Sequence, residues 1–70
     1  MSFYDYILNY IEDDDKFGDL AKDIEQDNCF PINETNIDKL KEYFDSQIDS
    51  DYIKEVAFDS LDYFSKGKWI

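Results

Sequence analysis

The fold class of this protein is decided by residues 15–27, which read DKFGDLAKDIEQD. Apolar residues recur in this stretch at spacings of three and four: Phe17, Leu20, Ala21 and Ile24. That spacing is typical of the buried face of an α-helix. No part of the chain shows the strict alternation of apolar and polar residues that marks a half-buried strand. The sequence therefore predicts a helix here and an all-α protein.

Three further helices are predicted from the same spacing on either side of this stretch. Their inward-facing residues are Phe3, Tyr6, Ile7, Tyr10 and Ile11 in the first; Ile37, Leu40, Tyr43 and Phe44 in the third; and Ile53, Val56, Ala57, Leu61 and Phe64 in the last. Residues that can cap a helix N-terminus precede each set: Ser2, then Thr35 or Asn36, then Ser50. Gly67 is suited to end the last helix, because glycine readily adopts a positive φ.

The connection around the only proline, Pro31, is the least typical segment of the chain. A proline disfavours helical geometry in the residue before it, so Phe30 is expected to lie outside a long helix. Because Phe30 is a large aromatic residue, we expect it to be buried in the core all the same. Cys29, its neighbour, has no nearby base or cation and is expected to be a buried, unreactive thiol. The sequence thus predicts four helices, with a possible fifth short turn around Pro31.

Length and composition limit both the size and the chemistry of the protein. With 70 residues, the chain is expected to form one domain over residues 1–70, with a small core. It has a formal net charge of −11, from 18 acidic residues against 7 lysines, and it contains no histidine and no arginine. We therefore expect no catalytic residues, no metal site and no cofactor. A single cysteine and the lack of a long apolar run indicate a cytoplasmic protein that does not enter a membrane.

A line of four aspartates, Asp15, Asp19, Asp23 and Asp27, is the most distinctive charged feature. Steps of four residues place them on one ridge of the second helix, about 6 Å apart along its axis. This acidic ridge is the candidate partner surface. Its alternative explanation is an ordinary solvated face, opposite the apolar one.

The ordered set of residues along the chain also resembles a known family. The matching positions are Ser2-Phe3-Tyr4-Asp5-Tyr6, Tyr10, Leu20-Ala21, Asp27 with Phe30-Pro31, Asp51-Tyr52, and Ala57-Phe58-Asp59. They are similar to the YozE family, small proteins of low-GC Gram-positive bacteria. The resemblance implies a sterile-alpha-motif-like (SAM-like) bundle of four to five short helices. It implies no assigned activity, although nucleic-acid binding has been suggested for the family from its fold.

Three functional hypotheses follow from these features. The leading one, implied by the SAM-like resemblance, is a small non-catalytic protein-interaction module, either monomeric or weakly self-associating. The alternative is an acidic decoy that mimics nucleic acid and occupies the binding site of a basic DNA- or RNA-binding protein. Direct nucleic-acid binding ranks third, because phosphates would be repelled. The chain also has Ile11 and Ile32 where family members tend to carry basic residues. We expect an unidentified protein partner, possibly basic.

Overall fold

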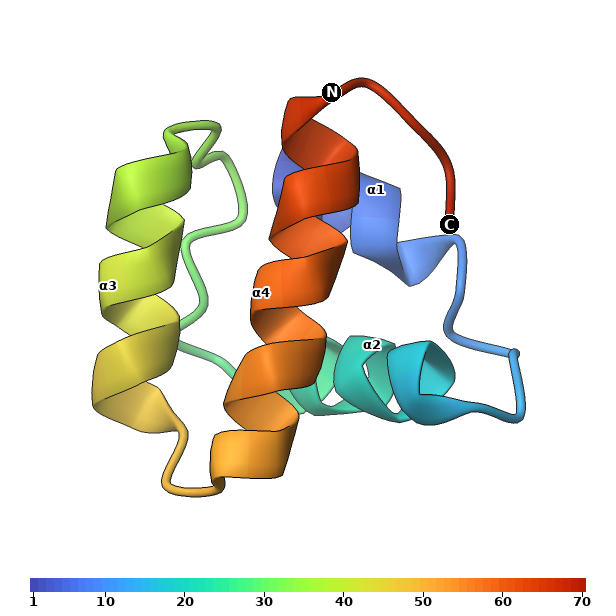
Figure 1. Ribbon diagram of the computed structural model, residues 1–70, viewed down its shortest axis with the longest axis horizontal. Helices are drawn as coiled ribbons and strands as arrows, with labels where there is room; N and C mark the ends of the chain where they lie inside the picture. The colour runs from blue at the N-terminus through green and yellow to red at the C-terminus, as the bar shows by residue number, and fades with distance from the viewer.

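The last and longest helix, α4 (Asp51–Ser65), is at the centre of the fold. In the computed structural model, which describes residues 1–70, three other helices pack against it: α1 (Phe3–Leu8), α2 (Lys16–Gln26) and α3 (Ile37–Gln47). The α3 helix runs antiparallel beside α4, while α2 crosses behind the lower half of α4 in this view and also contacts α1 (Figure 1). The structure contains four helices and no strand, which confirms the predicted all-α class.

Local side-chain caps explain where these helices begin. The Ser2 hydroxyl accepts a hydrogen bond from the Asp5 N–H (3.2 Å), and the Ser50 hydroxyl accepts one from the Ile53 N–H (3.4 Å). Between the two candidates for α3, the structure selects Asn36, whose side chain accepts from the Lys39 N–H at 3.1 Å. Each cap satisfies a backbone donor that has no partner within the helix.

Gly67 ends α4 with the positive φ of +68° that the sequence predicted. Its N–H donates to the Phe64 carbonyl (3.1 Å), and the Lys68 N–H donates to the Tyr63 carbonyl (3.0 Å). This pair of bonds defines a Schellman motif. The motif turns the chain sharply, so the residues after Gly67 fold back over α1.

Those last residues are attached by two tyrosines, Tyr6 of α1 and Tyr10 of the turn that follows it. The Tyr6 hydroxyl donates to the Lys68 carbonyl at 2.7 Å, and the Ile70 N–H donates to the Tyr10 hydroxyl at 2.9 Å. The Trp69 indole stacks on the Tyr6 ring with 5.0 Å between ring centres, although Trp69 remains 58% exposed. Burial, followed by the neighbouring Tyr10, raises the pKa of Tyr6 to about 12. The C-terminal segment is therefore held in place by specific contacts.

The hydrophobic core takes residues from every helix and one from a loop. Its buried members are Phe3, Tyr6, Ile7, Leu20, Ala21, Ile24, Phe30, Leu40, Phe44, Val56, Ala57 and Leu61. The loop residue is Phe30, which is only 5% exposed and lies edge-on to Tyr43, with ring centres 5.3 Å apart. The prediction that Phe30 is buried although it lies outside a long helix is confirmed.

Two residues close to Phe30 in the sequence are not buried with it. The expectation of a buried Cys29 was wrong, because this thiol is exposed. Ile32, on the other side, is 51% exposed. The physical reason is that residues 28–33 form turns, in which only Phe30 points into the core while its neighbours point outward. Proximity in sequence to a buried aromatic residue does not bury a side chain in irregular structure.

The first helix is shorter than its apolar pattern predicted. It ends at Leu8, and Tyr10 and Ile11 lie in the turns that follow. The turns are closed by hydrogen bonds between residues three apart, including Tyr10 N–H to the Ile7 carbonyl and Asp13 N–H to the Tyr10 carbonyl, each 3.0 Å. They bring the backbone of residues 10–13 against the first turn of α2. The pattern identified residues on one side of the chain but did not fix where the helix stops.

Candidate partner-binding groove

The four aspartates of the predicted ridge do not share one role. Asp15 lies outside α2 as its N-cap, with an extended backbone, and its carboxylate accepts from the N–H groups of Phe17 (3.0 Å) and Gly18 (2.9 Å). Its charge therefore stabilises the positive end of the helix. Asp19 and Asp23 lie on the helix itself and are exposed. Only these two match the description of solvent-facing helical carboxylates.

Asp27, the fourth aspartate, connects three parts of the fold. It is the C-cap residue of α2, with an extended backbone, and it is half-buried. One carboxylate oxygen accepts from the Cys29 N–H at 2.9 Å, and the other accepts a short hydrogen bond from the Tyr43 hydroxyl of α3. Burial, followed by this hydrogen bond, raises the pKa of Tyr43 to about 12. Asp27 therefore fixes the end of α2 to the Phe-Pro connection and to α3.

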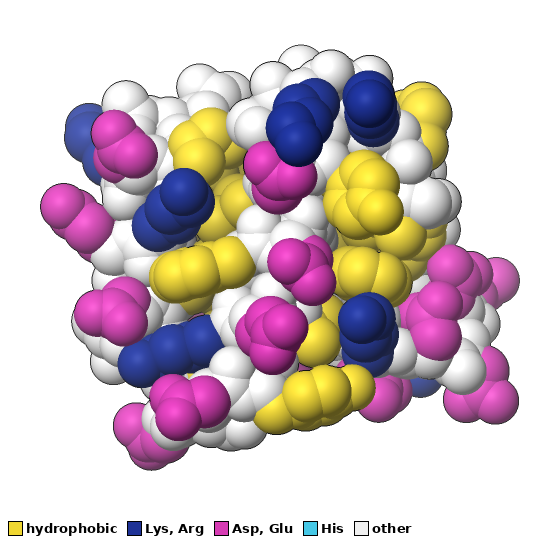
Figure 2. Space-filling view, viewed as in Figure 1, with side chains coloured by type: hydrophobic (Ala, Val, Ile, Leu, Met, Phe, Trp, Pro, Cys, Tyr) yellow, Lys and Arg dark blue, Asp and Glu magenta, His cyan; other side chains and the backbone are white.

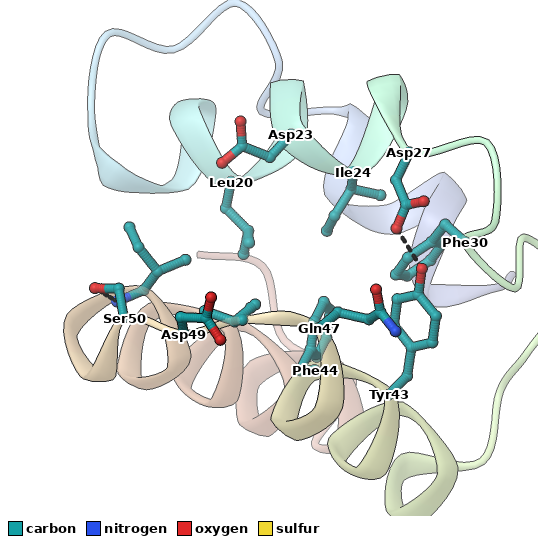
Figure 3. A pocket seen from close by; sticks show the side chains of 12 residues that line it. Leu20, Asp23, Ile24, Asp27, Phe30, Tyr43, Phe44, Gln47, Asp49 and Ser50 are labelled. Carbon is teal, nitrogen blue, oxygen red and sulfur yellow. Dashed lines mark hydrogen bonds between the residues drawn. The ribbon is translucent and has the colours of Figure 1, made fainter.

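An open groove of about 380 Å³ lies between α2 and α3. These two helices both pack on α4 but not on each other, so the space between them is not filled. Its lining is Leu20, Asp23, Ile24, Asp27, Phe30, Tyr43, Phe44, Gln47, Ile48, Asp49, Ser50 and Ile53 (Figure 3). Two of the four predicted surface residues, Asp23 and Asp27, belong to this groove, whereas Asp15 and Asp19 do not.

The groove has an apolar floor and a polar rim. Leu20, Ile24 and Phe44 are buried core residues that show their outer surfaces in the groove, and Ile48 and Ile53 add half-exposed side chains. The rim carries the carboxylates of Asp23, Asp27 and Asp49, together with the amide of Gln47. Such an arrangement can bury an apolar group while binding a positive charge beside it.

The sequence did not identify the α3 side of this groove. Tyr43 and Gln47 are four residues apart on one face of α3, and Asp49 follows in the short link to α4. Tyr43 was expected to face inward, and it does so only in part, since its hydroxyl reaches Asp27. No local pattern relates these residues to α2, from which they are separated by the whole Phe-Pro connection.

The protein as a whole is strongly acidic, with a formal net charge of −11. Figure 2 shows acidic side chains spread over one face, with lysine and hydrophobic side chains between them. Ion pairs neutralise few of these charges: Lys54 pairs with Asp45 (3.2 Å) and Lys66 pairs with Asp62 (3.0 Å). None of the groove carboxylates takes part in an ion pair. The electrostatic potential around the groove is consequently negative and attracts cations.

None of the four helices combines the length and the low polarity needed to cross a lipid bilayer.

Comparison with known proteins places almost the whole chain in one family. The family model described as "YozE SAM-like fold" matches residues 2–66, which include all four helices. The match confirms the resemblance seen in the sequence and the SAM-like architecture. Comparison with curated proteins and with solved structures gives no significant match.

Proposed function

Because this chain belongs to the YozE family of SAM-like fold, we propose that it is a small, non-catalytic protein-interaction module. The fold by itself does not assign a function, since one fold can host many. The proposal therefore rests on a particular surface, the groove between α2 and α3. We propose that a basic segment of a partner protein binds there.

The observation that carries this proposal is the combination of an apolar floor with unpaired carboxylates at its rim. Removing apolar surface from water contributes about 25 cal/mol for each Å² buried, so covering the half-exposed Ile48 and Ile53 supplies affinity. Carboxylates at an exposed rim contribute less affinity, but they accelerate association and favour partners of opposite charge. The net charge of −11 adds to this preference over longer distances.

The chemistry of the groove also supports a binding role. Without histidine, the chain has no side chain whose ordinary pKa lies close to neutral pH. One of the three groove carboxylates, Asp27, is already engaged by two hydrogen bonds. Binding requires only the shape and charge that the groove already has.

The proposal is tested by capturing partners from a lysate of the native host with immobilised protein. The groove variant is Asp23→Asn with Asp49→Asn. The matched control is Asp14→Asn with Asp38→Asn, which makes the same change in net charge at exposed sites outside the groove. We expect a protein that the wild type and the control retain, that the groove variant loses, and that elutes as salt rises. Equal retention by all three proteins would exclude the groove as the binding site.

The acidic-decoy hypothesis draws its support from the net charge and from the exposed Asp19 and Asp23. A nucleic-acid mimic needs closely spaced charges that are free to replace phosphates. In the predicted ridge, Asp15 and Asp27 are instead occupied by backbone and tyrosine donors. A decoy would compete with duplex DNA or RNA for its partner, so displacement of the captured protein by nucleic acid would favour this hypothesis over docking in the groove.

Direct nucleic-acid binding has the least support of the three hypotheses. Phosphate contacts provide most of the affinity of such proteins, and 7 lysines are spread among 18 acidic residues here. We expect no detectable binding of DNA or RNA at physiological salt in a fluorescence-anisotropy titration. Clear binding under those conditions would reverse the order of the proposals.

A further inference from the structure

The two ends of the groove differ in the charge that they offer. At one end, Asp23 of α2 and Asp49 of the link between α3 and α4 lie on opposite walls, near Leu20 and Ser50 (Figure 3). Both aspartates are exposed, and neither has a hydrogen-bond or ion-pair partner in the protein. This end presents two free carboxylates on either side of an apolar floor.

The other end is aromatic, and its carboxylate is already engaged. Asp27 accepts from Tyr43 and from the Cys29 N–H, so both of its oxygens have a donor. Phe30 and Tyr43 meet edge-on beside it, and Ile24 continues the floor (Figure 3). This end favours an apolar side chain, because fewer acceptor positions remain there for a cation.

We propose that the groove binds a helical partner segment in a single orientation. An arginine or lysine head group lies between Asp23 and Asp49, and an apolar side chain of the same segment covers Ile24 and Phe30 beside Tyr43. This inference rests on the proposed function and adds the chemistry and the direction of the bound segment.

The spacing of the partner's two side chains follows from the spacing of the groove. Asp23 lies on α2 and Asp27 is the C-cap residue that follows its last turn, four residues later, which corresponds to about 6 Å along the helix axis. A partner helix presents side chains three or four residues apart at a similar distance on one face. The basic and apolar residues of the segment should therefore be one helical turn apart.

A helix is the occupant that this groove favours. Its two walls are themselves formed by helices, and the protein contains no strand. It therefore offers no open sheet edge to which an extended peptide could add a strand. An amphipathic helix in a groove between helices needs no such edge, because its backbone hydrogen bonds are internal.

The first experiment tests whether Asp23 and Asp49 themselves recognise the arginine, as opposed to the overall negative charge of the protein. The probe is a 14-residue alanine-rich helical peptide with one phenylalanine and, four positions later, one arginine. A second peptide carries citrulline, which is neutral and nearly the same shape, in place of the arginine. NMR titrations give the dissociation constants for wild type, for the groove variant Asp23→Asn with Asp49→Asn, and for the control Asp14→Asn with Asp38→Asn.

The expected result is a coupling between the arginine and the two aspartates. Citrulline should weaken binding to wild type and to the control by about 2- to 5-fold, as for an exposed charge pair. It should have no effect on binding to the groove variant. An equal effect of citrulline on all three proteins would mean that only long-range charge attracts the peptide, and would overturn the proposal. Absence of peptide binding at millimolar protein would overturn it as well.

The second experiment measures the orientation. A nitroxide label at the arginine end of the peptide should broaden the amide signals of Asp23 and Ser50. The same label at the phenylalanine end should broaden those of Phe30 and Tyr43. Equal broadening from both labels, or the reverse pattern, would refute a single orientation. If the groove variant still loses its native partner in the capture experiment, the proposed function stands although this inference fails.

Discussion

The substitution Gly18→Ala separates what the local sequence predicts from what the tertiary structure requires. Gly18 lies in the first turn of α2, where glycine is less favourable than alanine by up to about 1 kcal/mol. By helix propensity alone, the alanine variant should be more stable than wild type. The structure predicts the opposite, because Gly18 is where the backbone of residues 10–13 touches α2.

The size of the effect follows from the atoms that a new methyl group would meet. A Cβ on Gly18 would overlap the Asp13 carbonyl oxygen and lie 2.8 Å from the Asp13 carbonyl carbon and 3.1 Å from the Tyr10 carbonyl oxygen. These are backbone atoms, so no side-chain rotation relieves the clash. Overpacking of this kind costs about 1–3 kcal/mol, and disturbing the bond from Asp13 N–H to the Tyr10 carbonyl adds about 1 kcal/mol.

After subtraction of the propensity gain, we expect a net loss of about 2 kcal/mol of unfolding free energy. In a domain of this size, that corresponds to a fall in Tm of about 8–16 °C. Urea denaturation followed by far-UV circular dichroism measures the change directly. Gly67→Ala is the matched control, since it has open space around its Cβ but a φ of +68°, and it should lose only about 1 kcal/mol. If the Gly18→Ala protein were as stable as wild type or more so, the close approach of the two backbone segments would be refuted.

Three further predictions concern burial, pH and salt. Phe30→Ala should cost about 3–5 kcal/mol, enough to unfold much of the protein, since Phe30 is a buried core residue; a variant with wild-type stability in urea would disprove this account of the connection. Tyr6 and Tyr43 have pKa values of about 12 in the folded protein against about 10 when unfolded, so folding favours their neutral forms. This contribution is complete below pH 10 and is lost as the pH rises towards 12, and a titration of tyrosinate absorbance in native and urea-unfolded protein should show the two tyrosines ionising late only when folded. Finally, Tm at pH 7 should rise from low to moderate sodium chloride, because salt screens the repulsion among 18 acidic residues over a Debye length of about 8–10 Å; a steady fall in calorimetry would mean that attractive ion pairs dominate.

The helical segments and their ends were largely predictable from short stretches of sequence. Ser2, Asn36 and Ser50 cap helices through backbone groups three residues away, and Gly67 ends α4 through bonds within one turn. These interactions depend only on neighbouring residues, so the residue types carry the information. The burial of Phe30 was also predictable, because a large aromatic side chain is more stable in the core than in water, and burying it is an efficient way for a small protein to bury apolar area.

The candidate site was predictable only in part. The sequence identified the four aspartates, and two of them, Asp23 and Asp27, do line the groove. It could not show that Asp27 is occupied by Tyr43, sixteen residues away, or that Asp49 lies across the groove from Asp23. It also did not predict that Cys29 is exposed beside a buried phenylalanine.

The sequence by itself determined four amphipathic helices, most of their caps and a strongly acidic surface, because each depends on spacing within a few residues or on composition. The tertiary structure decided where the first helix stops, why position 18 requires glycine, and which aspartates remain free. It also decided that α2 and α3 both rest on α4 while staying apart from each other. A groove exists only where elements distant in sequence leave space between them, and that space is fixed by how their side chains pack on a third helix.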